Sequence, residues 1–203
     1  KLESDGDIDT TFDSDGWVEK NFGSGDGSFD MAIDSNGKIV VAGYDNSANR
    51  WMVGRFNTDG SMDTTFGSGG EANISWGSGS NNKAYDLEIQ GDGKIVVAGI
   101  ADGYAALARL STTGSLDTTL DTDGKVNFSG FGLGSAFMGL AIQSDGKFVA
   151  VGYASTTSLL VADTLTARIT STGGLDTLFS SDGYDVYGTA GAYNIAGGVA
   201  MQP

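Results

Sequence analysis

The chain has 203 residues, 33 of them glycine, and contains neither cysteine nor histidine. Their absence excludes disulfides, zinc–thiolate sites and any catalytic triad built on imidazole. The 26 acidic residues outnumber the 11 basic ones, for a formal net charge of −15. Such a charge repels nucleic acid and anionic lipid, so we expect neither as a partner. The sequence also has no apolar run long enough for membrane insertion.

The opening segment of the chain recurs three times. Residues 1–12 read KLESDGDIDTTF, and related segments start 54, 54 and 59 residues apart, at Arg55, Arg109 and Arg168. A second landmark, SNGKIVVAGY from Ser35, returns in the same register from Gly91 and Ser144. Two landmarks that keep one register establish an internal repeat of about 54 residues.

Each repeat carries four strand signals in chain order. The first follows a glycine-rich turn, as at Trp17–Phe22, and the second alternates apolar and polar residues, as in 29–34. The third, Ile39–Tyr44, is a continuous apolar run typical of a strand covered on both faces. The fourth ends at the recurring arginine. Two segments with high helix propensity, Tyr104–Leu110 and Leu159–Ala167, fall in this fourth place, so we predict strands there.

Four antiparallel strands per repeat predict an all-β fold, a β-propeller built from four-stranded blades. A linear β-solenoid is the alternative. The repeats place the blades at approximately 5–57, 58–111 and 112–170, with a partial blade at 171–203. Lys1 takes the place of a strand-closing arginine, and the chain ends before an expected turn. We therefore expect a single repeat array, incomplete at both ends, that belongs to a longer propeller.

The landmarks resemble those of the delta-60 repeat family of bacterial propeller-like repeats. The resemblance rests on LDTTFGxxG-like boxes such as Met62–Gly70, on the DGKIVVAG box in Gly91–Gly99 and on ARL at Ala108–Leu110. It covers essentially the whole chain, although Leu120 and the pair at 177–178 blur the DTTF box. It implies an exported bacterial protein, often attached to the cell surface, with further repeats. It implies no reaction, because the family has no shared catalytic residues.

A carboxylate stands eight residues after each repeat start. Asp9, Asp63, Asp117 and Asp176 follow Lys1, Arg55, Arg109 and Arg168 at this spacing. We interpret these residues as structural, with each Arg–Asp pair fixing the turn between blades. A ring of ligand-binding carboxylates is the alternative.

Two acidic, glycine-containing loops are candidate calcium sites. One contains Asp13 and Asp15, and the other contains Asp121 and Asp123. Calcium prefers several oxygen ligands from such loops, but neither loop continues into the twelve-residue pattern that ends in glutamate. Turn formation explains both loops adequately. We therefore expect no cofactor, and calcium is the one alternative that the loops leave open.

Aromatic residues that differ between repeats are the candidate ligand contacts. Trp17 and Tyr184 stand where other repeats have Glu71 and Lys125, and Trp51 aligns with no other aromatic residue. Exposed rings stack on sugars, whereas buried ones pack between blades. The sequence is therefore consistent with a ligand contact or with packing between blades at each of these three residues.

The preferred functional hypothesis is a non-catalytic extracellular or cell-surface module for adhesion, glycan binding or protein binding. Open sheet edges suggest an alternative, a structural subunit completed by strand exchange in a homo-oligomer or filament. A carboxylate-based glycan hydrolase or lyase is a third hypothesis, because a suitably spaced acid pair can occur among so many acids. The sequence identifies no catalytic residue.

Overall fold

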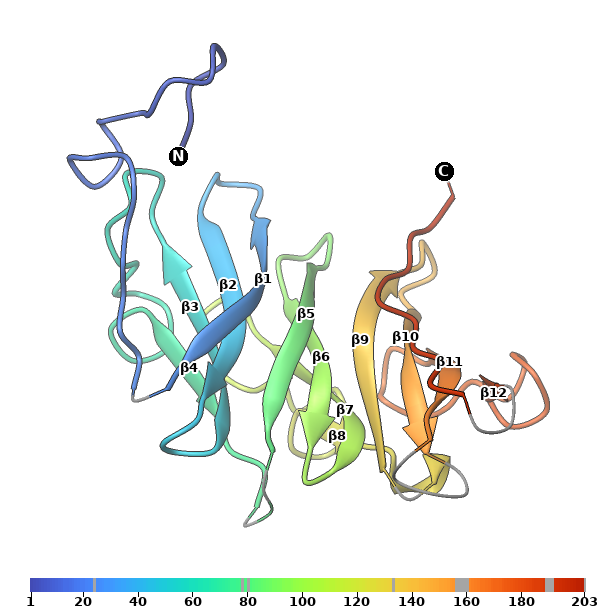
Figure 1. The fold of residues 1–203 in the computed structure, drawn as a ribbon. Coiled ribbons are helices and arrows are strands. Elements are labelled where there is room, and N and C mark those ends of the chain that lie inside the picture. The colour runs from blue at the N-terminus through green and yellow to red at the C-terminus, as the bar shows by residue number, and fades with distance from the viewer. Residues whose placement is uncertain are drawn as a thin grey trace.

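The computed structural model describes residues 1–23, 25–77, 79, 81–132, 134–155, 161–188 and 192–202. These residues form three four-stranded antiparallel sheets and one short 3-10 turn, η1 (Ser129–Phe131). The sheets stand side by side in an open arc, with the N-terminal segment rising beside the first sheet and the C-terminal segment beside the third (Figure 1). No described helix is long and apolar enough to cross a membrane.

Each sheet is a meander of strands in chain order. The first sheet contains β1 (Gly27–Ile33), β2 (Ile39–Asp45), β3 (Arg50–Phe56) and β4 (Glu71–Ile74). The second contains β5 (Lys83–Ile89), β6 (Ile95–Ala101), β7 (Tyr104–Leu110) and β8 (Lys125–Asn127). The third contains β9 (Gly134–Ile142), β10 (Phe148–Ser155), β11 (Asp163–Ile169) and β12 (Tyr184–Tyr187).

The sheets are offset by one strand from the repeats of the sequence. The strand after the glycine-rich turn was expected to open each unit, but β4 pairs with β3 of the preceding unit. β8 and β12 pair backwards in the same way. The corresponding segment at residues 17–22 forms no strand. Each sheet therefore takes its outermost strand from the next sequence unit, which links consecutive units covalently and by hydrogen bonds.

The two segments with helix propensity are strands, as the repeat register predicts. Tyr104–Leu110 is β7, paired along its length with β6. In the second segment, Asp163–Ile169 forms β11, and Leu159 and Leu160 lie outside the described residues. Tertiary pairing overrides local propensity here, because both segments are held between neighbouring strands.

A β-bulge interrupts each inner strand, the first strand of its sheet. In β1 the bulge lies between Ser28 and Asp30, opposite Gly43 of the VAG landmark. A Cβ at Gly43 would lie 2.0 Å from the carbonyl oxygen of Gly27, so only glycine fits. The same bulge occurs in β5 and places Asp86 as the first one places Asp30. A bulge redirects nearby side chains, which gives both carboxylates access to the neighbouring sheet.

The hydrophobic core consists of two layers between sheets. One layer joins the first and second sheets through residues such as Val40, Val53 and Val97, and the other joins the second and third sheets through residues such as Leu107 and Leu165. All five are completely buried. The burial of apolar side chains that stabilises the fold therefore takes place between neighbouring sheets.

Candidate functional site

The recurring arginines and aspartates form ion pairs, as the sequence predicts. In the first sheet, Arg55 Nε donates to Asp63 Oδ2 over 2.6 Å. Lys38 Nζ, from the landmark turn, donates to the same oxygen over 2.7 Å. This lysine was not among the predicted site residues, although it recurs in the NGK and DGK turns of the sequence. We call the resulting group the Arg–Asp–Lys cluster.

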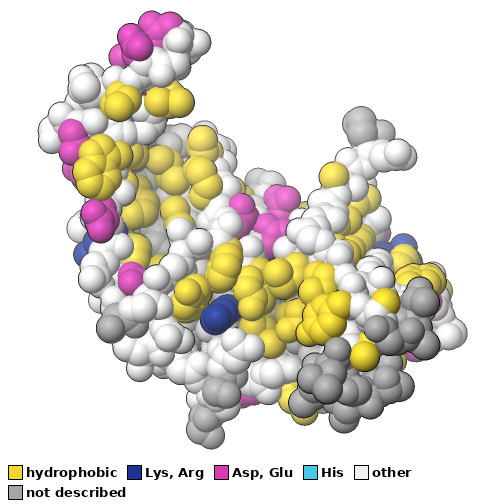
Figure 2. Space-filling view, viewed as in Figure 1, with side chains coloured by type: hydrophobic (Ala, Val, Ile, Leu, Met, Phe, Trp, Pro, Cys, Tyr) yellow, Lys and Arg dark blue, Asp and Glu magenta, His cyan; other side chains and the backbone are white. Residues whose placement is uncertain are grey.

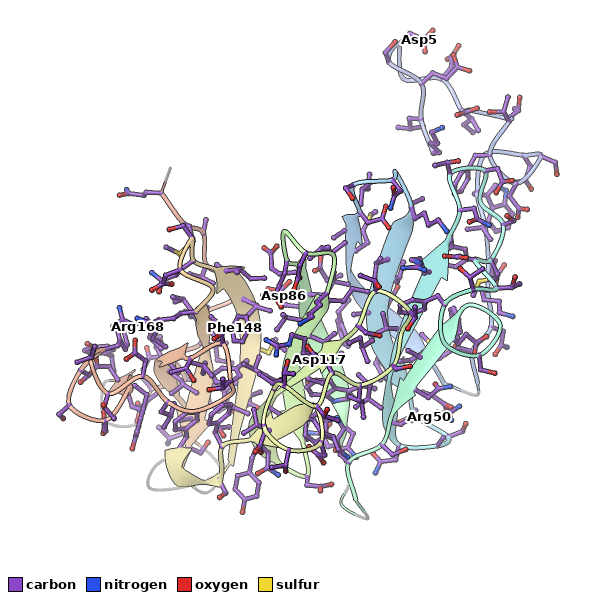
Figure 3. All side chains as sticks on the ribbon, turned by 180° about the vertical axis from the view of Figure 1, so that it is seen from behind. Asp5, Arg50, Asp86, Asp117, Phe148 and Arg168 are labelled. Carbon is purple, nitrogen blue, oxygen red and sulfur yellow. The ribbon has the colours of Figure 1, made fainter. Side chains whose placement is uncertain are left out.

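The cluster recurs in every sheet. Asp117 pairs with Arg109 over 2.8 Å and with Lys94 over 3.1 Å. Asp176 pairs with Arg168 over 2.7 Å and with Lys147 over 3.2 Å. Figure 3 labels Arg168, on β11, and Asp117, in the turn between β7 and β8. At the N-terminal segment, Lys1 Nζ lies 2.7 Å from Asp9.

The clusters keep their carboxylates ionised. Burial acts to raise the pKa of Asp63, but hydrogen bonds from Lys38, Thr65 and Arg55 outweigh it and hold that pKa well below its usual range. A hydrogen bond from Lys1 is the main cause that lowers the pKa of Asp9 to about 2. Carboxylates so fully committed to internal partners are poorly suited to bind a ligand or carry a proton.

The arginines also connect neighbouring sheets. Arg55 Nη1 donates to the carbonyl oxygen of Thr112 in the second sheet, and Arg109 Nη1 donates to that of Ser171 in the third, each over 2.8 Å. One guanidinium therefore fixes a turn within its own unit and docks the next sheet. This geometry supports the structural interpretation over the alternative ring of ligand groups.

A pair of carboxylates joins the inner strands. Asp30 Oδ2 and Asp86 Oδ1 both accept from the Leu87 amide, over 3.0 and 2.9 Å. Asp86 Oδ2 also accepts from the amide of Leu140 on β9 over 2.6 Å, and Figure 3 shows Asp86 between β5 and β9. Burial, reinforced by the neighbouring Asp30 carboxyl, raises the pKa of Asp86 to about 7. The sequence predicted the alternation of these strands but not this contact, because it depends on the bulge.

The three candidate aromatic residues lie in different environments. The expectation of a ligand contact at Trp51 is wrong, because its side chain is 0% exposed and its indole Nε1 donates to the Ile100 carbonyl over 2.8 Å. Trp17, in the N-terminal segment, is 58% exposed. Tyr184 is half-buried on β12, with its ring centroid 4.6 Å from that of Phe131. The structure does not bring the three together.

The two candidate calcium loops are tight turns. Asp15 Oδ1 accepts from the amide of Trp17, and Asp123 Oδ1 accepts from that of Lys125, each over 3.2 Å. Asp13 and Asp121 have positive φ, which aspartate tolerates better than most residues. Among the described residues, no group of three or more acidic side chains is placed to hold a metal ion. Calcium binding stays a prediction, supported by two carboxylates per loop.

Equivalent cavities lie at the two junctions between sheets, on the rim formed by the outer strands. We call them the first and second rim cavities. The first, of about 370 Å³, is lined by residues that include Trp76, Asp102, Asp123 and Lys125. The second, of about 400 Å³, is lined by residues that include Phe131, Asp182, Tyr184 and Asp185. Asp123 corresponds to Asp182 in the next repeat, and Lys125 corresponds to Tyr184, because each pair has the same spacing as Arg109 and Arg168. The two cavities therefore occupy the same place in the repeat.

The first rim cavity contains polar atoms without partners. Trp76 Nε1 and Asp102 Oδ1 are buried and have no hydrogen-bond partner among the residues that the structure describes. The Trp76 ring packs against Trp51, with centroids 4.7 Å apart, and lies beneath the Lys125 ammonium. An unpaired donor and an unpaired acceptor in one cavity wall are costly unless water or a ligand satisfies them.

Comparison with known proteins adds a fold-level finding. Two stretches, residues 35–66 and 90–120, match a family described as "Domain of unknown function (DUF5122) beta-propeller". They contain β2, β3, β6 and β7 with the turns that hold Asp63 and Asp117, and together they span less than half of the chain. Among curated proteins, no sequence matches this chain significantly.

The chain has a β-propeller fold. Its three sheets are blades, and they form an incomplete propeller because the arc does not close on itself (Figure 1). The prediction of a β-propeller built from four-stranded antiparallel blades is confirmed. The two stretches that match the β-propeller family are equivalent parts of consecutive repeats.

Proposed function

We propose that this β-propeller is a non-catalytic binding module that holds a glycan at its rim, for adhesion outside a bacterial cell or at its surface. The observation that carries the proposal is the recurrence of one cavity at successive junctions between blades. Both cavities fall within the roughly 300–1,000 Å³ typical of small-ligand sites. Their linings differ, with Lys125 in one and Tyr184 in the other, which is typical of surfaces that serve binding rather than folding.

The chemistry of the rim cavities suits a sugar. The half-buried Tyr184 ring offers an apolar surface beside the carboxylates of Asp182 and Asp185, which accept hydrogen bonds from hydroxyl groups. In the first cavity, Trp76 Nε1 is an unpaired donor and Asp102 Oδ1 an unpaired acceptor, and a sugar hydroxyl group can serve as the partner of either. The net charge of −15 favours a neutral glycan over an acidic one.

Sequence features support the remaining parts of the proposal. The resemblance to delta-60 repeats supports bacterial origin, export and the presence of further blades, and delta-60 membership is itself part of the proposal. The absence of histidine and cysteine supports a non-catalytic role. The recurring carboxylates are held in ion pairs with arginine, which also supports a non-catalytic role.

Affinity electrophoresis of the full chain through gels containing xylan, mannan or mixed-linkage glucan tests the proposal. We expect at least one of these neutral polysaccharides to retard the native chain. Asp182→Ala and Tyr184→Ala should each weaken the apparent affinity at least about fivefold, because each removes a contact worth roughly 1 kcal/mol. Tyr193→Ala is the matched control, since Tyr193 is exposed in the C-terminal segment and does not line the cavity.

Unchanged retardation in both cavity variants would disprove the proposed site. A native chain that none of the polysaccharides retards would count against glycan binding and favour a protein ligand. Shortened polysaccharide products in the gel lanes would overturn the non-catalytic role and favour a hydrolase or lyase. Circular dichroism of each variant distinguishes a lost contact from a lost fold.

A further inference from the structure

The bulge of each inner strand holds a large apolar side chain at the residue that the strand pairing leaves out. This residue is Phe29 in β1, Tyr85 in β5 and Met138 in β9. Bulges redirect side chains and are common beside functional sites. Phe29 is 51% exposed, and Tyr85 and Met138 are half-buried, so none of the three is a core residue. The repeat therefore supplies large side chains to the surface formed by the inner strands.

Aromatic rings of two blades meet on this surface. The Phe29 ring stacks on that of Tyr44 in β2, with centroids 5.5 Å apart, and meets the Tyr85 ring edge-on at 4.9 Å. Tyr44 is half-buried, so it also keeps part of its ring open to solvent. Figure 2 shows hydrophobic side chains gathered around a basic group in the middle of this face, below a group of acidic ones. An exposed apolar patch that continues from one blade to the next is typical of a binding surface.

Lys83, at the start of β5, belongs to this patch and differs from every other basic residue of the chain. Its Nζ lies 4.9 Å from the centroid of the Tyr44 ring. The other six lysines and all four arginines each lie within 3.8 Å of a carboxylate oxygen. Lys83 has no carboxylate partner among the residues that the structure describes. Its three N–H donors are therefore available to an anion from outside the chain.

The position of Lys83 is special to the second repeat. Gly27 and Ala136 are the equivalent residues in the first and third blades. A Cβ at Gly27 would lie 3.0 Å from Tyr44 Cε1, so the Tyr44 ring occupies space that a side chain would otherwise take. The missing side chain in one blade thus makes room for the ring that Lys83 of the next blade contacts.

Hydroxyl groups accompany the rings. The hydroxyl groups of Tyr44 and Tyr85 make no hydrogen bond to any residue that the structure describes. Burial, reinforced by the neighbouring Tyr153 and Tyr44, raises the pKa of Tyr85, and burial also raises that of Tyr153. These hydroxyl groups stay protonated at neutral pH, so they both donate and accept. The patch therefore combines apolar ring surface, hydroxyl groups and one ammonium group.

The acidic residues of the inner strands are placed to orient an anion rather than to exclude it. Asp86 follows Lys83 by three residues, which is roughly 10 Å along a strand and about one screening length in physiological salt. Its carboxyl group accepts from the Leu140 amide, and its pKa of about 7 leaves it only partly charged near neutral pH. An anionic group is therefore favoured at the Lys83 end of the patch and disfavoured at the other.

We propose that Phe29, Tyr44, Tyr85 and Lys83 form a binding site for a sugar that carries a carboxylate, a uronic acid unit of a polysaccharide. The apolar face of the sugar ring stacks on the exposed aromatic rings, and its carboxylate accepts from Lys83 Nζ. A single ammonium group suits a monoanion, whereas a phosphate would bring a second charge that no neighbouring cation balances. The site goes beyond the proposed binding of a neutral glycan, because none of its residues lines a rim cavity.

NMR titration of the full chain with tetragalacturonate in calcium-free buffer tests the proposal. The amide signals of Phe29, Lys83 and Tyr85 should shift. Methyl esterification of the ligand should weaken binding at least about fivefold, because it removes the charge that Lys83 binds. Lys83→Met should weaken binding of the acidic ligand to the same extent, and Lys83→Arg should retain most of it. Lys20→Met is the matched control, since Lys20 also lies over a ring, that of Phe22, but pairs with Glu71.

A second pair of variants tests the aromatic part of the site. Phe29→Ala should weaken binding at least about threefold through lost stacking, whereas Tyr187→Ala, exposed on the outer strand β12, should leave it unchanged. The dispersion of the NMR spectra shows whether each variant is folded.

The proposal is overturned if the inner-strand amides do not shift, if the methyl ester binds as tightly as the acid, or if Lys83→Met behaves like Lys20→Met. Equal shifts with acetate alone would overturn it in favour of a nonspecific anion effect. Lys83→Met should leave retardation by neutral polysaccharides unchanged, and Tyr184→Ala should leave tetragalacturonate binding unchanged. Failure of this site and failure of the proposed function are therefore distinguishable.

Discussion

The first and second blades contain nearly the same landmark, SNGKIVVAGY and GDGKIVVAGI, yet the two strands are buried to very different extents. All seven residues of β6 are buried, whereas β2 alternates between buried and half-buried positions. The difference lies in the neighbours, since the second blade is packed on both faces and the first on one. In a repeat fold of this kind, stability is the sum of what each unit contributes and what each junction adds.

The largest expected effect comes from removing the centre of an Arg–Asp–Lys cluster. Asp63→Ala leaves Arg55 and Lys38 without their shared carboxylate, and Asp63 and Arg55 are both buried. Breaking a buried ion pair from one side costs about 3–5 kcal/mol, so we expect a loss of about 4 kcal/mol in the free energy of unfolding. Urea denaturation followed by circular dichroism measures it.

Asp9→Ala is the comparison for this experiment. Asp9 has one lysine partner, which is half-exposed, so its loss should shift the urea midpoint far less than the loss of Asp63. Equal shifts in the two variants would contradict the view that the clusters hold neighbouring blades together.

A smaller effect is expected from a matched pair of apolar truncations. Leu87→Ala removes a buried side chain from the junction between blades and should cost about 3 kcal/mol. Met31→Ala, at the equivalent exposed position, should cost less than about 1 kcal/mol. Urea midpoints of both variants measure the contrast. Similar costs at the two positions would mean that packing against a neighbouring blade does not add to the stability of the second blade.

The sequence alone predicts the blade, but only part of what joins blades. Periodicity locates β2, β6 and β10, and the spacing of Arg55 and Asp63 predicts their ion pair. The pairing of β4 with the preceding unit escapes prediction, since a strand signal does not state which neighbour it joins. The contact between Asp30 and Asp86 depends on a bulge and on the position of a second blade. Trp51 stands out in the sequence because no other repeat has an aromatic residue at its position, yet its side chain lies in the hydrophobic core. A residue that differs between repeats can be either buried or exposed, so this signal does not predict a ligand contact.

The smallest effect sharpens the comparison at the junction itself and concerns pH. The pKa of Asp86 is raised to about 7 in the folded chain, mainly by burial and then by Asp30, and the pKa of Glu88 is raised for the same reasons. The folded state therefore holds a proton more strongly than the unfolded state, and stability falls as pH rises from about 4 through about 7. The carboxylates with lowered pKa values act in the opposite direction, but their contribution is complete above about pH 5. The chain has no histidine, so no imidazole titrates in this window.

Between pH 5.5 and pH 8, the free energy of unfolding should fall by about 1–2 kcal/mol, a figure already reduced for solvent screening because Asp86 is only half-buried. Urea denaturation at closely spaced pH values measures this slope. Asp86→Asn should remove most of it, whereas Asp92→Asn, at an exposed turn on the same blade, should leave it intact. A slope that survives in the Asp86 variant, or a native chain that becomes more stable towards pH 8, would show that Asp86 does not hold the proton of the folded state. Loss of the slope would instead identify Asp86 as the titrating group, so that the junctions combine ionised carboxylates in the clusters with a carboxyl on β5 that is protonated below about pH 7.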